Sequence, residues 1–165
     1  MTERIDIDAA IAHMADALRP LLSRNPLMVG IHSGGVWIAQ RLHQSLGLTE
    51  PLGALDISFY RDDFTRVGIN PQVKASELPV NIDDRHIILV DDVLHTGRTI
   101  RAAMNELFDY GRPASITLAV LIRREGRELP IQADAIGTTL DLAPNQRVKL
   151  TGPDPLELRI GEARR

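Results

Sequence analysis

The sequence predicts an α/β fold in which a parallel sheet is covered by helices on both faces. Short apolar segments alternate along the chain with segments whose apolar residues recur every three or four positions, the pattern of amphipathic helices. In addition, residues 86–90 (His-Ile-Ile-Leu-Val) are almost continuously apolar. Such a run is typical of a strand that is buried on both faces, as strands of parallel sheets are.

The first half of the chain predicts two helices and two strands. A helix is expected over residues 7–22, a strand over 27–31, and a second helix over 38–46 that ends at Gly47. The apolar positions of the first helix are Ile7, Ile11, Met14, Leu18, Leu21 and Leu22. A strand around residues 52–59 is expected to follow.

Residues 60–84 form a long polar segment with two prolines, a glycine and five acidic residues. Segments of this length without secondary structure are uncommon in compact domains and often close over a site. We therefore expect a mobile loop over about residues 60–84.

The second half begins with the strand at 86–90, which leads through a turn at 91–99 into a helix over 100–108 that ends near Gly111. A buried strand is expected at 116–122. Short strand-like pieces follow at 133–140, 147–150 and 156–160. No repeat or linker divides the chain, so residues 1–165 are expected to form a single domain.

Composition excludes several classes of protein. The chain has 165 residues, no cysteine, 44% hydrophobic residues, 25% charged residues and a net charge of −3. A disulfide framework, a catalytic thiol and cysteine-ligated zinc are excluded. The start of the chain lacks the features of a signal peptide, and no apolar run approaches the roughly 20 residues of a membrane span, so a cytoplasmic protein is expected. The acidic balance argues against a surface devoted wholly to nucleic acid.

The turn after the strand at 86–90 has the chemistry of a ribose-phosphate site. Gly97 and the hydroxyls of Thr96 and Thr99 precede a helix whose N-terminal N–H groups favour a phosphate. Asp91 and Asp92 would repel that phosphate, so they suit sugar hydroxyls or a hard cation such as Mg²⁺ beside it. A phosphorylated ribose satisfies both halves of the turn.

Other interpretations of this turn are weaker. An isolated Asp-Asp pair often only caps a helix or remains solvated at a strand end. A response-regulator receiver needs acidic residues at three separate places. The Gly-Lys-Ser/Thr of a Walker A loop and the Gly-x-Gly-x-x-Gly dinucleotide motif are both absent.

Residues 87–99 closely resemble the phosphoribosyl pyrophosphate (PRPP) signature of type I phosphoribosyltransferases. Residues 58–63, 111–116 and 127–131 resemble the PyrR family, whose members regulate pyrimidine operons and act as uracil phosphoribosyltransferases. The resemblance covers nearly the whole chain. It implies the type I phosphoribosyltransferase fold, with a small hood over about residues 123–160.

The resemblance also assigns roles to residues. Asp91 and Asp92 would hold the ribose hydroxyls, with Mg²⁺ bound near them together with PRPP. The 5-phosphate would lie in a loop made by Leu94, His95, Thr96, Gly97, Arg98 and Thr99. Pyrophosphate would contact a second loop, His32 followed by Ser33, Gly34 and Gly35, where the family often has Lys-Thr-Arg-Gly.

The remaining roles concern the lid and the base. Arg61 and Asp62 match catalytic residues at the base of the mobile loop. Arg123 would lie near the exocyclic oxygen of the base, and Ala135 and Ile136 would edge its ring. Family members commonly have an aromatic residue where this chain has Ala135.

The implied reaction joins uracil to PRPP and yields UMP and pyrophosphate, with Mg²⁺ as cofactor, in a homo-oligomer. A phosphoribosyltransferase for another base would share residues 91–99 and differ in the hood.

A regulator that binds leader RNA is the alternative from another class. Of the first-helix residues that bind RNA in the family, Ala9, Ala10 and His13 occupy the matching positions, so only the histidine is retained. Arg127 is retained near the hood, whereas Gln132 and Thr138 replace expected basic residues.

Overall fold

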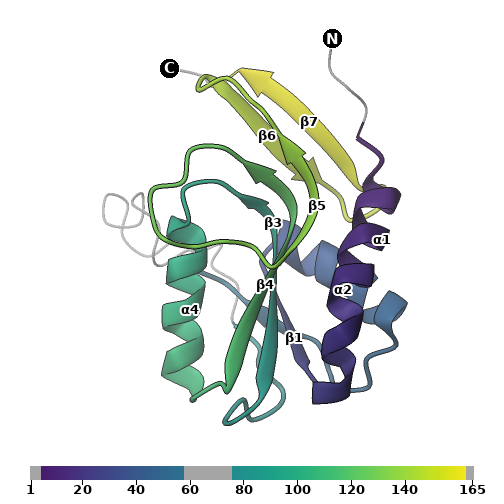
Figure 1. The fold of residues 1–165 in the computed structure, drawn as a ribbon, viewed down its shortest axis with the longest axis vertical. Helices are drawn as coiled ribbons and strands as arrows, with labels where there is room; N and C mark the ends of the chain where they lie inside the picture. The colour runs from purple at the N-terminus through teal and green to yellow at the C-terminus, as the bar shows by residue number, and fades with distance from the viewer. Residues whose placement is uncertain (1–4, 58–75, 163–165) are drawn as a thin grey trace.

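The computed structural model describes residues 5–57 and 76–162, and its centre is a parallel five-stranded sheet of order β2-β1-β3-β4-β5 (Figure 1). Parallel register joins all four neighbouring pairs of strands. The strands are β1 (Leu27–Ile31), β2 (Gly53–Leu55), β3 (His86–Leu94), β4 (Ser115–Arg124) and β5 (Ala135–Leu140). The predicted α/β class with a parallel sheet is confirmed.

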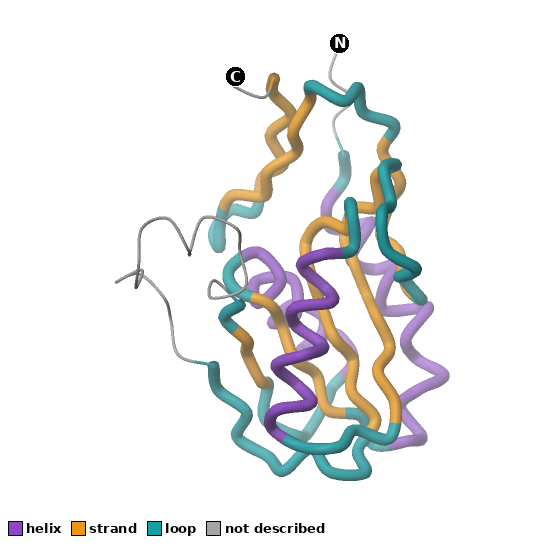
Figure 2. The backbone as a smooth tube through the Cα atoms, turned by 90° about the vertical axis from the view of Figure 1, so that its left-hand side faces the viewer, coloured by secondary structure: helices purple, strands orange, loops and turns teal. Residues whose placement is uncertain are grey.

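Helices cover both faces of this sheet. Helices α1 (Ile7–Leu18) and α2 (Gly34–Leu46) contribute to one apolar cluster, and α4 (Arg98–Tyr110) contributes to the other. Figure 2 shows the strands running side by side between these helices. The sheet therefore lies in the middle of three layers, which explains why residues 87–90 are all buried and apolar.

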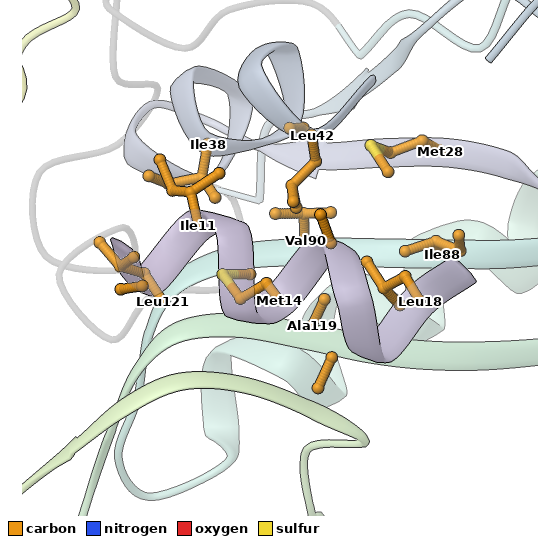
Figure 3. Packing of buried hydrophobic residues seen from close by; sticks show 14 of the residues in the cluster. Ile11, Met14, Leu18, Met28, Ile38, Leu42, Ile88, Val90, Ala119 and Leu121 are labelled. Carbon is orange, nitrogen blue, oxygen red and sulfur yellow. The ribbon is translucent and has the colours of Figure 1, made fainter. Parts of the chain in front are cut away.

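The larger cluster lies between the sheet and the helices α1 and α2. Figure 3 shows Met14 of α1 and Leu42 of α2 directed toward Val90 and Ala119 of the central strands. All four side chains are fully buried. The three- and four-residue spacing in the sequence thus marks the faces that meet the sheet.

Helix α1 begins and ends for local reasons. The Asp6 carboxylate accepts a hydrogen bond from the Ala9 N–H at 3.0 Å and caps its N-terminus. The α-helix ends at Leu18, and a 3-10 helix (Arg19–Arg24) with Pro20 near its start follows. The predicted helix over 7–22 is therefore wrong in its last turn, because proline favours the first turn of a new element.

Strand β3 extends past the predicted boundary at residue 90. Its ladder with β4 continues through Asp91, paired with Val120, to Leu94, paired with Arg123. The acidic pair therefore lies within the last part of a strand, and the turn is confined to residues 95–97. Placement on a strand gives the two carboxylates a rigid support.

Strand β2 is shorter than the expected 52–59 and is joined to the end of the predicted mobile loop. Ala54 and Glu77 exchange two backbone hydrogen bonds of 2.7 Å. Ile82 is buried against the sheet as well. Residues 76–84 are thus attached to the sheet, and residues 58–75 lie outside the described part of the chain.

The hood is made of two parts. β5 belongs to the main sheet, whereas β6 (Gln146–Thr151) and β7 (Glu157–Glu162) form a separate antiparallel hairpin at one end of the molecule (Figure 2). The hairpin packs through Leu150, which is buried in the same cluster as α1, and its turn at Gly152 lies against Trp37. In the described residues no helix is long and apolar enough to cross a membrane.

Candidate active site

The predicted site residues gather where strands β1, β3 and β4 end. The turn after β1 leads into α2, the acidic pair ends β3, and the next turn leads into α4. Because the strands are parallel, these carboxyl ends share one edge of the sheet, where α/β proteins bind their ligands. Arg61 and Asp62 lie outside the described residues.

The acidic pair is held by its own backbone. Asp91 Oδ1 accepts the N–H of Asp92 at 2.8 Å, and Asp92 Oδ1 accepts the N–H of Val93 at 2.8 Å. Asp91 is buried, with 5% of its surface exposed, and Asp92 is half-buried. Each carboxylate is thus held in one orientation before any ligand arrives.

The predicted pyrophosphate loop contacts this pair. A β-carbon on Gly34 would overlap Asp92 Oδ2 and lie 2.8 Å from its Cγ, and one on Gly35 would lie 2.5 Å from Val90 O. A cis peptide bond joins His32 and Ser33 just before the loop enters α2. The glycines therefore serve a close approach of two backbones, and they bring the N-terminal N–H groups of α2 beside the acidic pair.

The predicted phosphate loop turns at residues 95–97 and enters α4 at Arg98. Gly97 has a φ of 96°, a left-handed conformation that favours glycine, and Thr96 Oγ1 accepts the Arg98 N–H at 3.2 Å. The loop therefore directs the N-terminus of α4 toward the same edge of the sheet as Asp91, and that end of a helix favours anions.

Residues 125–131, here called the bracing segment, hold this loop from outside. The carbonyl of Thr96 accepts the N–H groups of Glu128 and Leu129 at 3.0 and 3.1 Å. A β-carbon on Gly97 would lie 3.3 Å from that of Leu129, and Arg98 Nε donates to Glu128 Oε1 at 3.0 Å. No local pattern in the sequence indicates this support, because the partners are about thirty positions apart.

A pocket of about 200 Å³ lies between the phosphate loop and the hood. It brings together two phosphate-loop residues, Leu94 and His95, with the predicted hood residues Arg123 and Ile136. The residues that complete the lining of this hood pocket are Arg124, Glu125, Arg127, Ile131, Gln132 and Ala133. Ala135 does not line it, because its side chain is on the other face of β5, buried in the α1 cluster with 2% exposed.

Arg124 is a site residue to which the sequence assigned no role. It is 8% exposed, and it donates from Nη1 to Gln146 O at 3.0 Å and from Nη2 to Ala143 O at 3.5 Å. Its Nε is buried and has no hydrogen-bond partner within the part of the chain that the structure describes. A buried basic residue at the end of an apolar strand is the signal that could have revealed it.

The electrostatics of the hood pocket act on His95. Burial and, secondarily, the charge of Arg124 lower the pKa of His95 below its ordinary value of 6.5, while Glu128 acts in the opposite direction. The imidazole of His95 therefore favours its neutral form more than an exposed histidine does. A neutral ring leaves the positive charge of the pocket on its arginines.

The positions matched to RNA binding lie on two different surfaces. Ala9, Ala10 and Thr138 line a shallow pocket between α1 and β5, where His13 Nδ1 donates to Ile136 O at 2.8 Å. Arg127 is exposed and lines the hood pocket instead. The histidine expected to bind RNA thus already has a partner within the fold.

The fit of the acidic pair to Mg²⁺ follows from its donor set. Within residues 5–57 and 76–162, no group of three or more acidic, histidine or cysteine side chains could enclose a metal ion. Mg²⁺ is usually bound by one or two carboxylates together with substrate phosphates and water, without a cage made wholly of protein. Asp91 and Asp92 fit a metal ion that is held jointly with a phosphorylated ligand.

A strand-end acidic pair beside two helix N-termini is the arrangement that the PRPP signature implied, and the sequence profile described as "Phosphoribosyl transferase domain" matches residues 4–150. This defines the class as a phosphoribosyltransferase. A "Bifunctional protein PyrR" from Nitrosococcus oceani is 60% identical over 162 residues, which cover 94% of this chain and 92% of that protein. Another "Bifunctional protein PyrR", from Pseudomonas paraeruginosa, is 58% identical over 90% of this chain and 89% of that protein. The chain belongs to the PyrR family of phosphoribosyltransferases.

Solved structures confirm the fold. A hypoxanthine-guanine phosphoribosyltransferase from Bacillus anthracis aligns with a TM-score of 0.67 at 16% identity, over 88% of this chain and 86% of that one. A purine phosphoribosyltransferase from Pyrococcus horikoshii aligns with a TM-score of 0.61 at 25% identity, over 84% of this chain and 87% of that one. The predicted type I phosphoribosyltransferase fold is therefore correct.

Proposed function

We propose that this phosphoribosyltransferase transfers ribosyl 5-phosphate from PRPP to uracil, giving UMP and pyrophosphate. The observation that carries the proposal is the contact between the acidic pair and the glycine loop, at Asp92 and Gly34. It supports the proposal because carboxylates that suit a diol lie beside the N-terminus of α2, which would bind pyrophosphate, and at the same sheet edge as the N-terminus of α4, which would bind the 5-phosphate. Uracil is the acceptor that the resemblance to the PyrR family implies, and the chain belongs to that family.

In this reaction the protein would mainly orient the two substrates and stabilise the charge that develops on the leaving group. The N1–C1′ bond forms, the C1′–O bond to pyrophosphate breaks, and the N1 proton is lost to solvent. Asp91 and Asp92 would fix the ribose through its hydroxyls, and the α2 N–H groups would stabilise the charge that develops on pyrophosphate. Mg²⁺, when bound beside Asp91 and Asp92 together with PRPP, would neutralise part of that charge.

The proposal is tested by the double variant Asp91→Asn and Asp92→Asn. Since removal of one stabilising group in an active site typically costs about 10²–10³ in rate, we expect PRPP-dependent UMP formation to fall at least that far. Asp141→Asn, an exposed aspartate outside the site, is the matched control. Near-normal activity in the double variant would remove the basis of the proposal, and a panel of bases would show whether uracil is the preferred acceptor.

A regulatory role is the second candidate, favoured by the word "bifunctional" in the relatives' names. Leader RNA is a weak candidate for the partner, because Ala9, Ala10 and Thr138 offer no charge to phosphates and the whole chain has a net charge of −3. We expect no submicromolar, salt-dependent binding to a pyrimidine-operon leader, with or without UMP. Filter binding over a range of salt concentrations tests this expectation.

A further inference from the structure

Trp37 is the only tryptophan of the chain, and it lies in the first turn of α2, directly after the predicted pyrophosphate loop. Its N–H donates to the carbonyl of Ser33 at 3.3 Å, a bond within this turn. The ring is half-buried and packs against the apolar cluster that α1 and α2 form with the sheet. A large, rigid side chain is thus attached to the short segment whose N–H groups lie beside the acidic pair.

The turn of the C-terminal hairpin packs against this ring. Gly152, between β6 and β7, is so near that a β-carbon there would lie 3.2 Å from Trp37 Cε3 and 3.5 Å from Cζ3. Leu156, in the same turn, packs against the same apolar cluster as Trp37. The hairpin itself is held by Leu150, which is buried in this cluster. A segment far away along the chain therefore supports the first turn of α2.

On the side of the sheet, this turn is contacted through glycines. Gly34 and Gly35 let it approach β3 so closely that a β-carbon on either residue would overlap atoms of that strand. A glycine permits such an approach but has no side chain that could hold the turn in place. Within the described chain, Ser33 at the N-cap makes no side-chain capping hydrogen bond either. The ring of Trp37 therefore supplies a support that the loop itself lacks.

We infer that Trp37 is a positioning residue of the proposed reaction and that the C-terminal hairpin acts through it. The inference rests on the proposed function, in which the N-terminus of α2 receives pyrophosphate, and it deepens that function by giving the hairpin a role in this step. Held between the hairpin turn and the apolar cluster, the ring keeps the N–H groups of α2 at one position relative to Asp92. Donors that are fixed before the reaction stabilise developing charge without a cost of reorganisation.

The test uses one probe for each end of the PRPP site, inorganic pyrophosphate with Mg²⁺ and ribose 5-phosphate, and calorimetry measures the Kd of each. In Trp37→Ala we expect pyrophosphate to bind about tenfold more weakly, the effect of losing roughly one hydrogen bond to a charged group. Ribose 5-phosphate should keep its wild-type Kd, because Thr96 and the rest of the phosphate loop do not depend on α2. Trp37→Phe, which keeps an aromatic ring, should restore most of the affinity for pyrophosphate.

The hairpin offers a second variant that leaves Trp37 in place. A β-carbon at Gly152 would press on the ring, so Gly152→Ala should weaken pyrophosphate binding by about threefold and shift the fluorescence emission of Trp37. Gly161→Ala, in the same hairpin, is the control, since a β-carbon there meets no atom within 4 Å. In a protein that already carries Trp37→Ala, Gly152→Ala should have no further effect on pyrophosphate binding, because the hairpin acts through the ring.

A purely structural role of Trp37 would weaken the binding of both probes equally, and this result would overturn the inference. Unchanged pyrophosphate binding in Trp37→Ala would overturn it as well, and so would additive effects of the two substitutions in the double variant. If Trp37→Ala does not fold, Gly152→Ala and Trp37→Phe carry the same comparison of the two probes. The proposed function has its own point of failure: if the wild-type protein binds neither probe, that function fails first and the inference fails with it.

Discussion

Gly34 and Asp92 are so close that a β-carbon at position 34 would overlap the Asp92 Oδ2 atom. The pair joins the loop after β1 to the end of β3, two segments that are far apart in the sequence. Their contact sets how far the predicted pyrophosphate loop lies from the predicted ribose-binding pair. The absence of a side chain at position 34 is therefore part of the geometry of the site.

Replacing Gly34 with alanine should displace either the loop or the Asp92 carboxylate. We expect a loss of about 1–3 kcal/mol in the free energy of unfolding, the usual cost of overpacking, and a larger relative loss in PRPP affinity. Urea unfolding and calorimetry measure the two effects. Gly161→Ala is the control, since a β-carbon at Gly161 meets no atom within 4 Å; equal effects in both variants would contradict the prediction.

Glu106 on α4 should make the protein less stable as the pH rises. Burial, assisted by the charges of Asp56 and Asp109, raises the pKa of Glu106 above its ordinary value of 4.5, although the Ser76 hydroxyl donates to its Oε1 at 2.5 Å. The folded state thus holds the proton more tightly than the unfolded chain, and this stabilisation is lost as the pH rises through the folded-state pKa.

The variant Glu106→Gln tests this directly, because it keeps the acceptor for Ser76 and removes the charge. We expect its urea midpoint to exceed that of the wild-type protein at pH 7 and the difference to disappear below about pH 4.5, where the unfolded carboxyl is also protonated. Glu162→Gln, at an exposed residue, is the control. A constant difference over the whole pH range would count against the prediction.

The pKa of His95 should respond in opposite directions to its two charged neighbours. Arg124→Gln removes a positive charge and should raise the pKa of His95, whereas Glu128→Gln removes a negative charge and should lower it. NMR titration of the imidazole resonances measures both changes. Shifts in the same direction would show that the variants alter the burial of His95 more than its electrostatics.

Because the pKa of His95 is lowered in the folded state, the protein should lose stability when this histidine is charged. The contribution of His95 to the free energy of unfolding should be constant above its unfolded-state pKa of 6.5. It should decrease as the pH falls through the folded-state pKa. His95→Asn should flatten the pH dependence of unfolding in that range. Unfolding curves recorded between pH 5 and pH 8 test it.

Met14→Ala should destabilise the fold by about 2–5 kcal/mol, because it empties space between α1 and the sheet. The side chain is fully buried there, opposite Ala119 (Figure 3). Phe108→Ala is the control, since Phe108 is 54% exposed on α4 and should cost far less. Chemical denaturation of the two variants measures the difference, and similar losses would contradict the assigned core.

Much of the fold was predictable because local and tertiary preferences agree. The run Ile87–Val90 is typical of a strand buried on both faces, and Gly47 ends α2 with a φ of 63°, as a terminal glycine should. The errors lie where distant partners decide. The ladder with β4 extends β3 past Asp91, and the pairing of Glu77 with Ala54 attaches the end of the expected loop.

The site residues also fall into those that local sequence indicates and those that distant partners determine. The acidic pair and the loops around Gly34 and Thr96 come from contiguous motifs, so the sequence alone indicates them. The lining of the hood pocket cannot be predicted from contiguous motifs, because the direction of each side chain depends on the register of β4 and β5. That register buries Ala135 and turns Arg124 into the pocket, which no short motif reveals.

The strand order also has a consequence for how the molecule is made. β3, which carries Asp91, lies between β1 and β4, so β1 pairs with a strand that is synthesised only after α2 and β2. Parallel, non-local pairing of this kind folds slowly. A nascent chain that ends before residue 115 leaves the apolar edge of β3 without its β4 partner, so the chain should be most prone to aggregation at this stage of its synthesis.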